Sequence, residues 1–190
     1  MRVNGVNAKA TACFICSLFA GCSFFQERLP DVVLSDADVL SVLQSLGQGE
    51  IDAAQLALEK SAAPAVKAFA ARVLNEHRGL AQANGRLAEE LSLEPRPPAL
   101  AAQLRQAHED EMRTLRVTTG PAFDRAYVEY EIRQHVRAFH FVEAAAESET
   151  TPQLKQALIR TGPDLLSHIS AARAVERRLG SEPTQAVASR

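Results

Sequence analysis

Apolar residues recur every three or four positions along four long stretches of the chain, the spacing of helices with one buried face. The stretches cover residues 35–60, 64–94, 121–147 and 152–179. A shorter amphipathic stretch at 99–116 follows a proline-rich approach and suits a crossover between two pairs of helices. No long run alternates β-branched and polar residues as a strand would. The pattern therefore predicts an all-α protein.

Local signals mark where these helices begin and end. Ser35 is followed three residues later by Asp38, a capping-box arrangement, and Pro64 and Pro152 occupy first-turn positions. Inside the last stretch, Pro163 removes a backbone hydrogen bond, so we expect a kink about one turn before His168. Gly180 is a plausible cap that would end that helix after Leu179.

Each long helix has a polar residue near the middle of its apolar stripe. These residues are Glu50, His77, His135 and His168. At about 1.5 Å of rise per residue, the two members of each consecutive helix pair lie at nearly the same height, close to mid-helix. Three imidazoles and one carboxylate at one level predict a candidate site for a single transition metal ion, Zn, Fe, Mn or Cu.

Two acidic residues lie one turn before histidines of this set. Glu131 precedes His135 and Asp164 precedes His168, so each carboxylate is placed to orient an imidazole on its own helix. A purely structural interpretation stays open beside the metal site, because a buried polar layer can also fix the register of packed helices. A ferritin-type di-iron centre is disfavoured, since Glu-x-x-His pairs are absent at these positions.

The first residues differ in composition from the rest of the chain. Arg2 and Lys9 precede an apolar run, residues 10–20, that is shorter than the roughly 20 residues needed to span a bilayer. The run ends in Leu-Phe-Ala-Gly-Cys, which resembles a bacterial lipobox with Cys22 as the lipidated residue, although a plain signal peptide is the alternative. We expect a signal at 1–21, a tether at 22–34, a folded domain at 35–180 and a disordered tail at 181–190.

Composition excludes several classes of function. The formal net charge is −2 and basic residues are scattered among acidic ones, so no nucleic-acid partner is expected. Nucleophile motifs and phosphate-binding loops are absent from the sequence. No catalytic residue is assigned, and whether the protein is an enzyme stays open.

The two helix pairs resemble copies of one unit, since PAVKAFAARV and PQLKQALIRT match in their Pro, Lys and Arg positions. Together with GPAFDRAYVEYEIRQHVRAF and TPQLKQALIRTGPDLLSHISAA, they make the chain resemble a bacterial domain-of-unknown-function family of exported ferritin-like proteins. The resemblance implies a ferritin-like four-helix bundle at the periplasmic face of an outer membrane, without a known activity.

The sequence is compatible with three functions. The first is a lipid-anchored bundle that contacts other proteins of the cell envelope, in maintenance or stress. The second is a metal-binding or redox bundle that uses Glu50, His77, His135 and His168. A small apolar ligand held between the helix pairs is a third interpretation.

Overall fold

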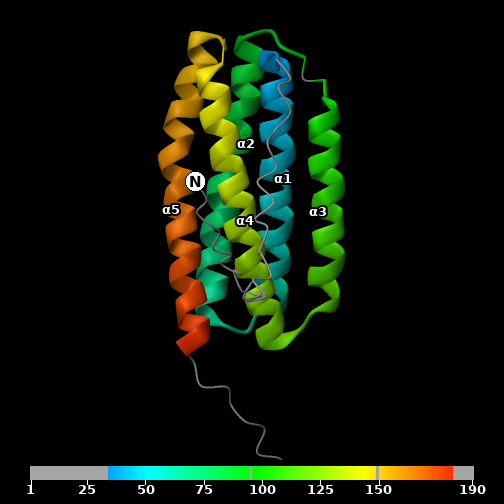
Figure 1. Ribbon diagram of the computed structural model, residues 1–190, viewed down its shortest axis with the longest axis vertical. Coiled ribbons are helices and arrows are strands. Elements are labelled where there is room, and N and C mark those ends of the chain that lie inside the picture. The colour runs from blue at the N-terminus through cyan, green and yellow to red at the C-terminus, as the bar shows by residue number, and fades with distance from the viewer. Residues whose placement is uncertain (1–33, 95, 149, 182–190) are drawn as a thin grey trace, which may run out of the picture. The chain divides into compact units, whose positions relative to one another are not determined.

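The computed structural model describes residues 34–94, 96–148 and 150–181, which lie in one compact unit. Within these residues the chain is entirely helical, as predicted. The helices are α1 (Asp36–Lys60), α2 (Pro64–Glu90), α3 (Ala99–Val117), α4 (Gly120–Glu147) and α5 (Pro152–Ser181), shown in Figure 1. The proposed signal, Cys22, nearly all of the tether and residues 182–190 lie outside the described residues.

Consecutive helices run in opposite directions and pack as two hairpins. One hairpin is α1 with α2 and the other is α4 with α5, while α1 also contacts α4 and α2 also contacts α5. Helix α3 carries the chain back along the outside of α1, against which it mainly packs (Figure 1). None of the described helices is both long enough and apolar enough to cross a membrane.

The predicted starts of α1, α2 and α5 are confirmed, and two predicted ends are wrong. Helix α2 ends at Glu90 and does not reach residue 94. Ser35 Oγ accepts a hydrogen bond from the Asp38 N–H, and Asp38 Oδ2 accepts one from the Ser35 N–H. Pro64 begins α2 and Pro152 begins α5. Helix α5, however, continues through Gly180 to Ser181 instead of ending at Leu179. Pro163 lies inside α5 without interrupting it, and the kink stays a prediction.

A dry core fills the half of the helices nearest the α1–α2 turn. Its large members come mainly from α4, where Phe123 and Tyr127 are completely buried and stack with their rings 6.3 Å apart. Small residues of α1 and α2 pack against them, among them Ala57 and Ala70. Burial of this apolar surface is the main force that holds the hairpins together in this half.

Close approach of α3 explains one of the two glycines in the middle of α1. A Cβ atom on Gly49 would lie 3.2 Å from His108 Nδ1 and 3.4 Å from the hydroxyl oxygen of Tyr130. His108 Nδ1 and that hydroxyl are hydrogen-bonded at 2.9 Å, and His108 Nε2 lies 3.5 Å from Asp52 Oδ2. The cost of glycine inside a helix is therefore offset here by the contact between α1, α3 and α4.

Candidate metal centre

Buried polar side chains from four helices meet at one level, where the dry core ends. They are Glu50 on α1, His77 on α2, Glu131 and His135 on α4, and His168 on α5. All are at most 5% exposed. The structure thus places the four residues predicted from the helical stripes in one cluster, and it adds Glu131 as a member.

His135 is the centre of this cluster because its two ring nitrogens face different groups. Its Nδ1 lies 2.8 Å from the carbonyl oxygen of Glu131, one turn earlier in α4. Its Nε2 lies 3.3 Å from Nε2 of His77 and 3.0 Å from Nδ1 of His168. The rings of His77 and His168 both stand nearly perpendicular to that of His135. Three nitrogens therefore converge on one side of His135.

The hydrogen-bond partners assign the protons on two of these rings. A carbonyl oxygen only accepts, so His135 carries its proton on Nδ1 and has a free electron pair on Nε2. His168 Nε2 lies 2.5 Å from the Glu76 carboxylate and donates to it, which in the neutral ring leaves an electron pair on Nδ1. Two electron pairs then face each other at 3.0 Å. That contact is repulsive unless a further proton or a cation lies between the nitrogens.

The carboxylates lie on the opposite side of His135. Glu131 Oε2 is 3.4 Å and Glu50 Oε2 is 3.7 Å from His135 Nδ1. By hydrogen-bond geometry, Glu50 Oε2, both carboxyl oxygens of Glu131 and the nearby hydroxyl of Tyr127 have no partner among the described residues. The pKa of Glu131 nevertheless responds to both Glu50 and Tyr127, so these oxygens interact with one another inside the cluster.

Burial determines the charge of the cluster. Removal from water raises the pKa of Glu131 to about 7. Burial, together with the neighbouring Glu131, raises the pKa of Glu50 well above its ordinary value. Burial also lowers the pKa of His135 to about 3 and that of His77 to about 4, helped by the neighbouring imidazoles. Both of these histidines are consequently neutral near pH 7, the form in which imidazole binds a metal.

The separations between the nitrogens fit a metal ion. A tetrahedral Zn²⁺ with bonds of about 2.0–2.1 Å places its ligand atoms about 3.3 Å apart. The observed nitrogen separations of 3.3 and 3.0 Å are close to that value. Two groups of three residues have donor atoms near enough to share an ion: His77 with His135 and His168, and Glu50 with Glu131 and His135. His135 belongs to both groups.

The carboxylate that orients His168 is Glu76 and not Asp164. Asp164 is exposed on α5, whereas Glu76 reaches across from α2 and is itself held by Arg72 at 2.9 Å. Burial alone would raise the pKa of Glu76, but hydrogen bonds with Arg72 and His168 lower it below its ordinary value. The predicted role of Asp164 therefore belongs to a residue on the neighbouring helix.

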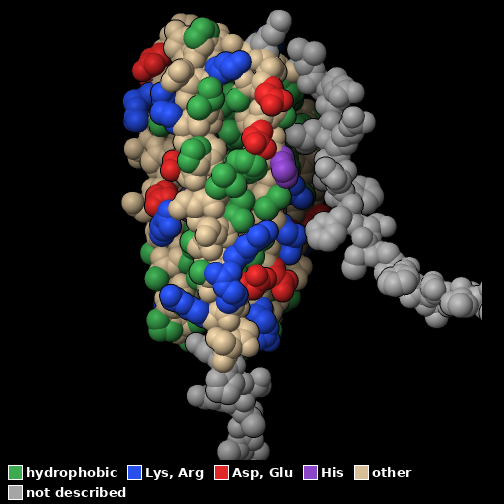
Figure 2. All heavy atoms as spheres, turned by 60° about the vertical axis from the view of Figure 1, so that its left-hand side comes forward, with side chains coloured by type: hydrophobic (Ala, Val, Ile, Leu, Met, Phe, Trp, Pro, Cys, Tyr) green, Lys and Arg blue, Asp and Glu red, His purple; other side chains and the backbone are tan. Residues whose placement is uncertain are grey.

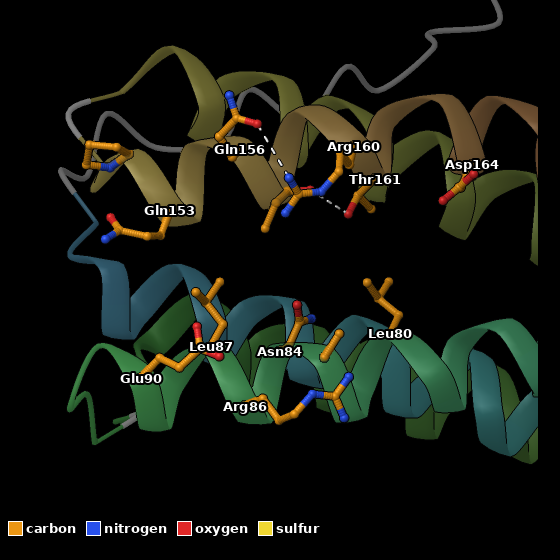
Figure 3. A pocket seen from close by; sticks show the side chains of 13 residues that line it. Leu80, Asn84, Arg86, Leu87, Glu90, Gln153, Gln156, Arg160, Thr161 and Asp164 are labelled. Carbon is orange, nitrogen blue, oxygen red and sulfur yellow. Dashed lines mark hydrogen bonds between the residues drawn. The ribbon is translucent and has the colours of Figure 1, made fainter.

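A groove between α2 and α5 leads to this cluster. Its outer part has a volume of about 730 Å³ and lies between the C-terminal half of α2 and the N-terminal half of α5 (Figure 3). Its inner part, about 400 Å³, is lined by His77, His168 and Glu76. The two parts share Leu80, Ala83, Thr161 and Asp164 as lining residues, so we treat them as one α2–α5 groove.

A separate and shallower groove lies on the outer side of α4 and α5. It has a volume of about 310 Å³ and is lined by Gly162 and Pro163 together with Phe139 and Leu166. Ile159 and Leu166 are among the exposed large apolar residues there. Figure 2 shows hydrophobic side chains gathering in the upper half of one face and basic residues in the lower part. The histidine cluster does not line this groove.

The sequence predicted neither the complete burial of Glu131 nor the contact between Glu76 and His168. Glu131 lies one helical turn from His135, and that spacing was the signal that identified it. Glu76 directly precedes His77 and thus points away from it along α2, so only the position of α5 reveals its contact with His168. Tyr127 gave no signal, because a tyrosine at a core position is ordinary.

The fold and the cluster define an all-helical protein with a buried histidine and carboxylate centre. The chain belongs to the family described as Domain of unknown function (DUF4142), whose sequence profile matches residues 26–175. Neither among curated proteins nor among solved structures was a match to the chain found.

Proposed function

We propose that this protein binds one transition metal ion between Nε2 of His77, Nε2 of His135 and Nδ1 of His168. The observation that carries the proposal is the convergence of three ring nitrogens in a buried site, with Nε2 of His135 at 3.3 Å from Nε2 of His77 and at 3.0 Å from Nδ1 of His168. A cation between the rings would be bound by all three nitrogens. The carboxylate of Glu76 and the carbonyl of Glu131 hold the protons on the other nitrogens of His168 and His135.

The nitrogen donors favour Cu²⁺ or Zn²⁺ over Mn²⁺ and Fe²⁺. Imidazole suits copper and zinc, and affinity for a given site generally increases from Mn²⁺ towards Cu²⁺. Glu50 and Glu131 lie beyond His135, on the side away from the nitrogens that would hold the ion. With this donor set the ion supplies Lewis-acid or redox chemistry, and the protein keeps it in a site from which most water is excluded.

A polar layer that only fixes helix register is the alternative explanation of the cluster. In that case a proton, and not a metal ion, lies between Nε2 of His135 and Nδ1 of His168. The unpaired atoms Glu50 Oε2 and both carboxyl oxygens of Glu131 lie on the other side of His135, so they do not distinguish the two explanations. Measurement of bound metal distinguishes them directly.

Elemental analysis of protein purified without a His-tag tests this proposal. Metal-free protein is dialysed against Cu²⁺, Zn²⁺, Fe²⁺ or Mn²⁺, the unbound ion is removed, and the bound metal is counted per chain. We expect about one ion of Cu²⁺ or Zn²⁺ per chain in the wild type and almost none in His135→Ala. The matched control is His140→Ala on the same helix, at an exposed position with 68% of the side chain accessible. A wild type that retains no metal would refute the proposal.

We further propose a ferritin-like arrangement and an envelope location. The two antiparallel hairpins joined by α3 support the arrangement, since a crossover between hairpins is typical of ferritin-like bundles. Residues 10–20 and Cys22 motivate a lipid anchor at the periplasmic face of the outer membrane, where the domain would also contact envelope proteins. Labelled palmitate should be incorporated by the wild type and not by Cys22→Ser, and equal labelling of both would contradict the anchor.

A further inference from the structure

We propose that the metal ion keeps an open coordination position, reached through the α2–α5 groove, that binds a small anion. This inference rests on the proposed metal site and specifies what that site binds. It predicts that a small Lewis base such as azide, hydroxide or a carboxylate completes the coordination of the ion. Three features support the open position: an incomplete set of protein ligands, a route from solvent, and the positive charge of the ion, which favours an anionic ligand.

The three nitrogens that converge beside His135 do not complete the coordination of a metal ion. Within the described residues, only His77, His135 and His168 form the nitrogen group, and no carboxylate or thiolate joins it. Glu76 touches His168, but its carboxylate lies at Nε2, the nitrogen that is not turned towards His135. Structural zinc sites use four protein ligands, whereas three protein ligands are typical of sites that keep one position for water or substrate.

The α2–α5 groove gives that position a route from solvent. His77 and His168 both line the inner part of the groove, while His135, Glu50 and Glu131 are at most 2% exposed and lie further inside. Arg72 of α2, which lines the inner part of the groove, donates a hydrogen bond to Ser167 of α5 at 3.0 Å and so bridges the two helices. Above this bridge, exposed Ala83 and Asp164 form part of the walls. Ligands therefore approach the centre between α2 and α5.

The charge of the ion and its surroundings favour an anion as the fourth ligand. Three neutral imidazoles leave the full charge of a divalent ion in a buried site, where unscreened charge is costly. An anionic ligand bound directly to the ion removes part of that charge. The groove itself adds no net attraction, because its three arginines are matched by three carboxylates: Arg72, Arg86 and Arg160 against Glu76, Glu90 and Asp164. The preference for an anion therefore comes from the charge of the ion.

Azide binding to the Cu²⁺-loaded protein tests the inference by absorption spectroscopy. We expect a new azide-to-copper charge-transfer band that saturates as azide is added. In Ala83→Trp the indole would occupy the groove, and the affinity for azide should fall about tenfold or more while copper stoichiometry stays unchanged. The matched control is Ala81→Trp, an exposed position on α2 that does not line the groove. Circular dichroism of each variant checks that α2 still folds.

A charge variant gives a second test that does not depend on filling the groove. Asp164→Asn removes a negative side chain from the groove wall and should strengthen azide binding severalfold at low ionic strength, with the gain vanishing in high salt. Copper that binds without an azide band, or an Ala83→Trp variant with wild-type azide affinity, would overturn this inference and leave the metal site standing. A wild type that binds neither Cu²⁺ nor Zn²⁺ would overturn both.

Discussion

Helix α2 faces two different environments along one continuous apolar stripe. In its first half, Val66, Ala70 and Val73 are completely buried in the dry core. In its second half, Leu80, Asn84 and Leu87 continue the same heptad but are only partly buried. The change occurs at His77, where the polar cluster separates the closed half from the half that contains the groove.

The residues of α5 that face α2 explain why the two halves of α2 differ in burial. Beyond His168, α5 presents Ala172 and Val175 to the dry core. Before His168 the α5 residues that line the groove include Gln156, Arg160 and Thr161. Figure 3 shows Leu80 and Leu87 pointing from α2 toward α5, with Thr161 on the facing side. A sustained heptad on one helix therefore does not produce close packing unless its partner is equally apolar. The histidine cluster lies at the boundary, between the closely packed first half of α2 and the groove that lines its second half.

The largest expected effect is the loss of a side chain from the closed half. Phe123→Ala removes a completely buried ring and should lower the free energy of unfolding by about 3–5 kcal/mol. Leu87→Ala in the open half should cost only about 1 kcal/mol, because Leu87 is partly buried and lines the groove. Urea denaturation of both variants measures the contrast. Equal losses would mean that the two halves are packed alike.

The ionisation of Glu131, which lies in the buried polar cluster, should make the stability of the protein depend on pH. Its pKa is about 7 in the folded protein and 4.5 as the ordinary value, so folding favours the protonated form. Protonation of Glu131 therefore stabilises the folded state fully below about pH 4.5. This stabilisation is lost as the pH rises through about 7. In metal-free protein, Glu131→Gln should therefore gain stability relative to the wild type with rising pH, by an amount on the order of 3 kcal/mol.

Urea denaturation at about pH 5 and about pH 8.5, with a chelator present, measures this gain. Glu129→Gln, an exposed position two residues away, is the control and should keep a constant difference from the wild type. A Glu131→Gln curve that stays parallel to the wild type would show that Glu131 ionises as freely in the folded chain as in the unfolded one.

Metal binding should stabilise the whole domain by linking α2, α4 and α5. A metal present at about 100 times its dissociation constant adds about 2.7 kcal/mol to the unfolding free energy. For a chain of this size the melting temperature should rise by about 5–10 °C. Differential scanning calorimetry with Zn²⁺ measures the rise. His77→Ala removes the ligand at the groove and should suppress most of it, whereas an unchanged rise would place the ion elsewhere.

The sequence predicted the height of the cluster because a helix has a fixed rise per residue. Counting from the turns aligned Glu50 with His77 and His135 with His168. In the structure His77, His135 and His168 form one group of possible ligands, whereas Glu50 shares a group with Glu131 and His135. The capping box of Ser35 was equally predictable, since its geometry depends only on residues within one turn. These features are local, or follow from the periodicity of a single helix.

Contacts between helices were not predictable in the same way. The partner of His168 is Glu76 and not Asp164, because α2 and α5 are neighbours across the two hairpins. The groove arises from polar residues of α5 opposite an apolar stripe of α2, and the pattern of α2 alone contains no sign of it. Identifying such features requires knowing which helices are adjacent and how far apart they lie.

The smallest expected effects come from replacing glycine by alanine. They compare a position on α1 that α3 covers with a position in the half of α2 that contains the groove. Gly85→Ala on α2 meets no atom within 4 Å, so it should raise the unfolding free energy by about 0.5–1 kcal/mol through helix propensity alone. Gly49→Ala gains the same propensity, but its Cβ atom would press on His108 and Tyr130 at 3.2–3.4 Å. Because those two side chains are hydrogen-bonded to each other, the displacement should cancel or reverse the gain. Chemical denaturation of both variants in parallel gives the comparison, and a Gly49→Ala protein as stable as Gly85→Ala would show that α3 yields easily at this contact.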